Sequence, residues 1–71
     1  MKVKANFAEI KKKGKERGLT TYKAICRASG YSYGCFSKAK HFDYAPLTMI
    51  WLFSDLFECT MNELVVVDWE K

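Results

Sequence analysis

Residues 21–40 read TYKAICRASGYSYGCFSKAK and contain two short helix signals separated by a break. A helix is expected over 22–28 and a second over 33–40, because each range follows a hydroxyl-bearing residue that can accept hydrogen bonds from the first amides of a helix. Gly30 separates the two ranges, since glycine readily adopts the left-handed conformation that ends a helix. Two short helices joined by so few residues are typical of a helix-turn-helix.

A further helix is expected before this stretch. Asn6 and Glu9 have the spacing of a capping box, in which two side chains satisfy free amides at the start of a helix. Gly18 stands where such a helix should end. Gly14 lies inside it and is unfavourable there by about 1 kcal/mol relative to alanine, so the helix should be weaker than its many lysines indicate.

Two more helices are expected after the central stretch. A loop over 41–45 leads to Pro46, which suits the first position of a helix because its missing amide hydrogen is not needed there. Residues 60–63 form a second capping box and begin a last short helix. The valine-rich tail 65–69 fits either a short strand or a frayed helix end. The core stripe expected on the fourth helix consists of Leu47, Ile50, Phe53, Ser54 and Phe57.

The 71 residues are expected to form one domain, 1–71, with a core over 6–66 and a tail over 67–71. No segment before Val65 alternates with the period of a strand, so the predicted fold class is all-α. The apolar stretches are too short for a membrane helix, and the first residues do not resemble a secretion signal. We therefore expect a cytoplasmic protein with no membrane partner.

Catalysis, metal binding and a bound cofactor are not expected. His41 is the only histidine, and there is no Ser-His-Asp arrangement and no glycine-rich phosphate loop. Cys26, Cys35 and Cys59 match no metal-binding spacing and are interpreted as small apolar side chains. We expect the chain to bind a macromolecule and to have no small-molecule substrate.

Charge is divided along the chain. Residues 1–41 carry eleven Lys and Arg against two acidic residues, whereas residues 42–71 carry one Lys against six. A segment with a net charge of +9 attracts polyanions, among which nucleic acid is the first candidate. The opposite charge of the second segment indicates a surface with a different partner.

Several short motifs lie at regular intervals between Leu19 and Leu64. They are Thr21 at a helix start, the pair Ile25-Cys26, the turn Gly30-Tyr31-Ser32, the pair Phe36-Ser37, and the apolar positions Leu47, Ile50, Phe53, Phe57, Cys59 and Met61. In spacing and residue type this pattern resembles the lambda-repressor/Cro-like (XRE) family of DNA-binding domains. The resemblance implies a compact five-helix domain in which helices two and three form the helix-turn-helix. The short length is similar to that of single-domain regulators of phages and mobile elements.

Two positions depart from the family pattern. Tyr22 stands where the family usually has a glutamine that links helix two, the phosphate backbone and the recognition helix. The pair His41-Phe42 replaces the usual Asn-Gly after the recognition helix. These differences from the family pattern somewhat favour a protein partner over DNA.

The resemblance also indicates a binding face. In this fold the first part of helix three enters the major groove, and Phe36 and Ala39 point to the core, so the opposite face is free. The residues expected to contact DNA, or a protein partner instead, are Thr21, Tyr22, Ser32, Tyr33, Gly34, Ser37, Lys38, Lys40 and His41. Partial burial is the alternative for Tyr33, and solvation is the alternative for both lysines. The face has no Arg, Asn or Gln, so the operator sequence is not predicted.

The fourth helix has more apolar residues than one core stripe needs. The surplus residues and the tail are expected to form a protein interface, most simply that of a homodimer. This interface would consist of Met49, Trp51, Leu52, Leu56, Val66 and Trp69. The alternative is that a small domain buries these side chains internally.

Two functions follow from these observations. The first is a phage or mobile-element transcriptional regulator of the lytic/lysogenic switch, which binds double-stranded operator DNA in the host cytoplasm, at the nucleoid. The second is an antirepressor, which binds the cognate phage repressor protein and modulates its binding to DNA. Both use the same helix-turn-helix scaffold.

Overall fold

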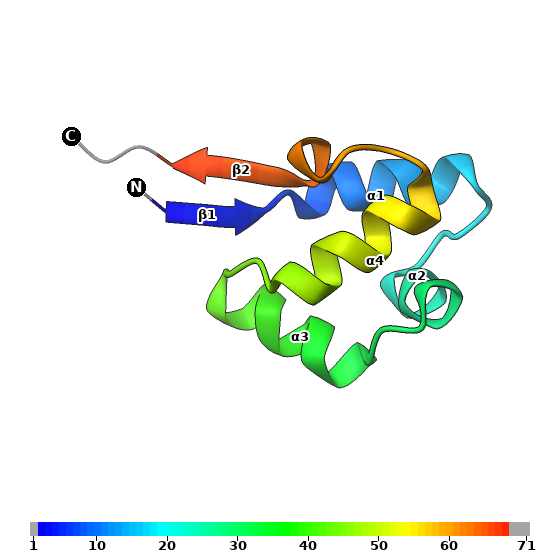
Figure 1. Ribbon diagram of the computed structural model, residues 1–71. Helices are drawn as coiled ribbons and strands as arrows, with labels where there is room; N and C mark the ends of the chain where they lie inside the picture. Colours follow the sequence, from blue (N-terminus) through cyan, green and yellow to red (C-terminus); the bar gives the residue numbers. More distant parts are fainter. Residues whose placement is uncertain (1, 69–71) are drawn as a thin grey trace.

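The computed structural model describes residues 2–68, and of Lys2 and Asp68 it describes the backbone alone. The described chain is mostly helical and contains one two-stranded sheet. Figure 1 shows α1 along one side, α4 across the middle and α3 on the far side of α4, with both strands projecting at one end. The elements in order are β1 (Lys2–Ala5), α1 (Phe7–Glu16), α2 (Tyr22–Ser29), α3 (Tyr33–Phe42), α4 (Leu47–Phe57), the short 3-10 helix η1 (Met61–Leu64) and β2 (Val65–Asp68).

The first three helices begin where the capping residues predict. The side chains of Asn6, Thr21 and Ser32 accept hydrogen bonds from the backbone amides three residues later, at 3.2, 3.1 and 3.5 Å. Each bond satisfies one amide that has no partner inside its helix. Gly30 ends α2 with a φ of 82°, the left-handed conformation predicted for it.

Two helix predictions need correction. Helix α3 continues through His41 to Phe42, so the loop predicted from His41 is wrong. The helix ends instead at Asp43, which takes the left-handed conformation at a φ of 56° and donates its amide hydrogen to the Ala39 carbonyl. The predicted fifth helix is one turn of 3-10 helix, in which the Glu63 carboxylate accepts a hydrogen bond from the Thr60 amide at 3.0 Å.

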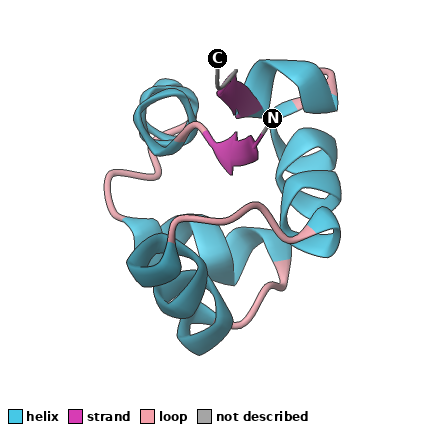
Figure 2. Ribbon diagram, turned by 90° about the vertical axis from the view of Figure 1, so that its left-hand side faces the viewer, coloured by secondary structure: helices cyan, strands magenta, loops and turns pink. Residues whose placement is uncertain are grey.

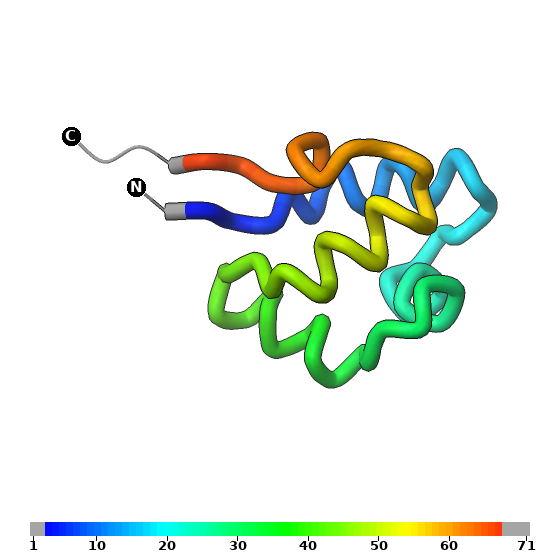
Figure 3. Tube along the Cα trace, in the orientation of Figure 1, coloured from blue at the N-terminus to red at the C-terminus, as the bar shows by residue number. Residues whose placement is uncertain are grey.

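The described chain is mostly helical, as predicted, but the all-α prediction is wrong at the N-terminal end, where β1 was not expected. β1 pairs antiparallel with β2, and Val3 faces Val67 in the register while Ala5 faces Val65. The tail therefore forms the strand that its composition allowed, although the predicted Trp69 contact lies outside the described residues. β1 was not predicted because its alternation spans only four residues. Figure 3 shows the two strands running side by side at one end of the molecule.

The core lies where α2, α3 and α4 meet α1 and η1. Phe36 and Phe53 are at its centre, with ring centroids 6.0 Å apart. Figure 2 looks at the molecule from the end that carries the strands and shows the helices arranged around them. The buried apolar residues are Ala5, Ile10, Ile25, Cys26, Phe36, Ala39, Met49, Ile50, Phe53, Phe57 and Leu64.

The stripe predicted on α4 is correct except at its first position. Ile50, Phe53, Ser54 and Phe57 are buried, but Leu47 is 74% exposed. Met49, predicted as an interface residue, is fully buried instead. The buried stripe of α4 is centred between Met49 and Ile50. Relative to this stripe, Leu47 lies on the side of the helix that faces away from the core.

Candidate nucleic-acid interface

The first turn of α2 lies beside α3, and their side chains make two contacts between an ammonium group and an aromatic ring. The Lys40 Nζ atom lies 4.7 Å from the centroid of the Tyr22 ring. The Lys23 Nζ atom lies 5.3 Å from the centroid of the Tyr33 ring. Lys11 of α1 reaches the same Tyr22 ring at 5.5 Å. We call these five residues the lysine–tyrosine surface.

The Tyr22 ring is held firmly in this surface. It packs on Phe36 with centroids 4.9 Å apart, and its hydroxyl donates a hydrogen bond to the Phe7 carbonyl at 3.4 Å. Burial raises the pKa of Tyr22, so the hydroxyl stays protonated and remains a donor at neutral pH. Tyr22 is thus a half-buried support, and its hydroxyl is occupied within the protein.

The segment that carries four of these five residues, all but Lys11, has no acidic residue. Residues 17–42 carry five Lys and Arg and no Asp or Glu. Within the described part of the chain, carboxylates pair with Lys4, Lys13 and Arg17. No ion pair is found there for Lys11, Lys12, Lys15, Lys23, Arg27, Lys38 or Lys40.

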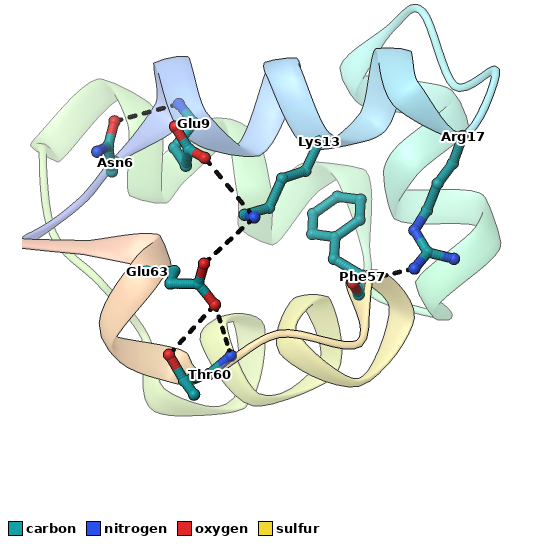
Figure 4. Close-up of polar contacts among 7 residues, drawn as sticks. All are labelled: Asn6, Glu9, Lys13, Arg17, Phe57, Thr60 and Glu63. Atoms are coloured by element: carbon teal, nitrogen blue, oxygen red, sulfur yellow. Dashed lines mark hydrogen bonds and ion pairs between the residues drawn. The ribbon is translucent and has the colours of Figure 1, made fainter.

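Two paired cations, Lys13 within α1 and Arg17 directly after it, connect α1 to the elements packed beside it. Figure 4 shows Lys13 between Glu9 and Glu63, with the nitrogen 3.6 Å from an oxygen of each carboxylate. Arg17 donates a hydrogen bond to the Phe57 carbonyl at 3.0 Å and so supplies a partner to the end of α4. These contacts point toward η1 and α4, whereas Lys11 points toward Tyr22.

The outer face of α3 carries most of the predicted contact residues. Gly34, Ser37, Lys38 and His41 are all exposed, and Tyr33 is 43% exposed. The burial alternative for Tyr33 is therefore only partly realised, by its stacking on Phe36. The structure thus gathers these side chains on one helix surface.

The remaining predicted contact residues lie along the edge between α2 and α3. The hydroxyls of Thr21 and Ser32 act as helix caps at exposed positions. Lys40 is exposed but turns toward Tyr22. Sequence reasoning did not predict the contacts of Lys11 and Lys23 with tyrosine rings, because each contact joins two different helices and residue spacing carries no signal of that kind.

A second surface is apolar. Phe42, Tyr44, Leu47 and Trp51 are exposed around the turn from α3 into α4, and we call them the apolar strip. Leu47 and Trp51 are adjacent on the surface of α4 because they are four residues apart.

The predicted interface is distributed differently. Trp51 is 59% exposed, whereas Leu52 and Leu56 are half-buried on the opposite flank of α4. Val66 is exposed on the sheet. The strip therefore retains Trp51 from the predicted set and adds three residues that were not predicted.

The three cysteines are free thiols. Cys26 is buried, and desolvation raises its pKa to about 11, so it is a neutral apolar side chain at physiological pH. No group of three potential metal ligands is found among the described residues. Within that part of the chain, no helix is long and apolar enough to cross a bilayer.

Comparison with known protein families, with curated proteins and with solved structures finds no match to this chain.

Proposed function

We propose that the chain is a transcriptional regulator that binds double-stranded operator DNA, with α2 and α3 as a helix-turn-helix. The observation that carries the proposal is the charge of residues 17–42. This segment has five cations and no acid, and it folds into two short helices joined by a glycine turn. Arg17 pairs with Glu58, and no ion pair is found among the described residues for the other four cations, which can attract the phosphates of nucleic acid.

In this proposal the outer face of α3 enters the major groove. Lys38 reaches the acceptors of a guanine, and Ser37 forms a hydrogen bond to a base edge. Gly34, which has no side chain, allows close approach of the backbone. The resemblance to phage and mobile-element regulators supports a role in a lytic/lysogenic switch in the host cytoplasm.

The test is binding of the purified protein to a random duplex library, followed by titration of the selected duplex. We expect Tyr33→Ala combined with Lys38→Ala to abolish binding while helical content and melting temperature stay nearly unchanged. Lys12→Ala, which removes an exposed unpaired charge from α1, is the matched control and should retain binding. Survival of binding in the double variant would show that α3 is not the recognition helix.

The apolar strip favours a second candidate function, that of an antirepressor. Exposed Phe42, Leu47 and Trp51 side chains fit a protein better than a phosphate backbone. The partner would be the cognate phage repressor protein. Co-purification of the two proteins, and loss of the repressor's own operator shift in the mixture, would support this function. If the two fail to associate, it is ruled out.

A further inference from the structure

We propose that Lys11 and Lys40, seated over the ring of Tyr22, form a clamp for neighbouring phosphates on one strand of a DNA duplex. The clamp acts independently of base sequence and lies beside the recognition surface of α3. The inference rests on the proposed function and extends it to a defined phosphate site.

The site is assembled from three helices. Lys11 comes from α1, Tyr22 is the first residue of α2, and Lys40 comes from the last turn of α3. The two ammonium nitrogens lie 5.5 and 4.7 Å from the same ring centroid, so they are at most 10.2 Å (5.5 + 4.7) apart. The contacts of Tyr22 with Phe36 and with the Phe7 carbonyl fix the ring beneath them.

The charges at the site are uncompensated. Neither Lys11 nor Lys40 has an ion pair within the described residues. Two ammonium groups that share one ring repel each other, and an anion that contacts both offsets this repulsion. The amide end of α2 also lies here, because Tyr22 is its first residue, and its partial positive charge adds to the attraction.

The phosphates of a DNA strand fit such a site better than a carboxylate of a folded protein partner does. Neighbouring phosphates follow each other about 3.4 Å apart along the axis of one strand, so two of them can engage two nearby cations. Lysine binds phosphate as a point charge and needs no fixed orientation. Each such contact releases counterions, and its signature is the dependence of affinity on salt.

The experiment measures affinity for two unrelated duplexes of about 20 base pairs over roughly 50 to 200 mM salt. We expect Lys11→Gln and Lys40→Gln each to lower the slope of log affinity against log salt by about 0.9, and to weaken binding roughly tenfold near 0.1 M salt. The loss should be equal on both duplexes because the clamp does not read bases. Lys12→Gln changes the neighbouring lysine, for which no ring contact is found among the described residues, and should leave the slope unchanged. Melting curves confirm that each variant is folded.

Two results would overturn the inference, and they are distinguishable. If the wild type binds and the Lys11 and Lys40 variants keep its slope, the clamp is wrong while the proposed function stands. If the wild type binds neither duplex even at low salt, the proposed function fails and the clamp fails with it.

Discussion

Gly14 occupies the middle of α1, where glycine is normally unfavourable, because the helix approaches its neighbours closely at this point. A Cβ atom added to Gly14 would lie 2.5 Å from the Ile25 side chain and 2.9 Å from the Leu19 carbonyl oxygen. That carbonyl belongs to the turn after α1, and the Leu19 amide in turn donates a hydrogen bond to the Gly14 carbonyl at 2.7 Å. Glycine therefore lowers the helix propensity of α1, but the absence of a side chain allows α1 to pack closely against α2.

Gly14→Ala is expected to lower the free energy of unfolding by about 1–3 kcal/mol, because the overpacking outweighs the better helix propensity of alanine. Gly34→Ala is the matched control on α3. The nearest atom to its added Cβ would be the Ser32 hydroxyl oxygen at 3.6 Å, an ordinary contact. It should raise the free energy of unfolding by up to about 1 kcal/mol. Urea denaturation measures both changes, and equal effects would contradict the close approach at Gly14.

The charge of Glu63 makes the free energy of unfolding depend on pH in the acidic range. Its carboxylate accepts a hydrogen bond from the Thr60 amide and lies near Lys13, and these two contacts lower its pKa from the ordinary value of 4.5. A carboxyl group with a lowered pKa in the folded state stabilises the fold above its unfolded pKa. This stabilisation is lost as the pH falls below 4.5 and through the lowered pKa.

We therefore expect Glu63→Gln to be less stable than the wild type near pH 7, with the difference shrinking as the pH approaches about 3. Urea denaturation over this range measures it. Glu16→Gln, an exposed carboxylate of α1 for which the described residues show no ion pair, is the control and should follow the wild type. A difference between Glu63→Gln and the wild type that is the same at every pH would refute the role of the carboxylate charge.

At the scale of elements, local signals were sufficient to predict where α1, α2 and α3 begin and insufficient to predict the end of α3 and the pairing of the two strands. Thr21, Gly30 and Ser32 act within a few residues of themselves, so sequence alone placed the ends of α2 and the start of α3. The pairing of Val3 with Val67 joins the two ends of the chain, and a four-residue strand carries too weak a pattern to predict it. The Lys11 contact with Tyr22 was missed for the same reason, since it depends on how α1 packs against α2.

The register of the sheet predicts unequal effects of proline at neighbouring positions. The Asn6 amide donates to the Leu64 carbonyl at 2.8 Å, and hydrogen-bonded pairs alternate along antiparallel strands. Val66 thus uses its amide in the ladder opposite Lys4, whereas the amide of Val67 points away from β1. We expect Val66→Pro to reduce the unfolding free energy by roughly 1 kcal/mol more than Val67→Pro does. Denaturation of the two variants measures this, and the reverse order would disprove the register.

At the scale of the whole molecule, the cationic and apolar surfaces lie at different places, and we propose different uses for them. The lysine–tyrosine surface lies between α1, α2 and α3, and the apolar strip lies at the turn into α4. A regulator that binds DNA through the first surface has the second one free for another copy of itself. Two copies would match two operator half-sites about one helical turn apart.

The whole-molecule prediction concerns self-association through the apolar strip. In a dimer built on this strip, Leu47→Ser combined with Trp51→Ser should produce a monomer with nearly unchanged unfolding free energy, because both side chains are mostly exposed, at 74% and 59%. Met49→Ala on the same helix is the contrast. Met49 is fully buried, so its truncation should lower the unfolding free energy by about 2–5 kcal/mol. Sedimentation over a range of protein concentrations measures the oligomeric state, and urea denaturation measures the unfolding free energy. A wild type that stays monomeric at every concentration would leave the strip free for the repressor of the second candidate function and would contradict the dimer.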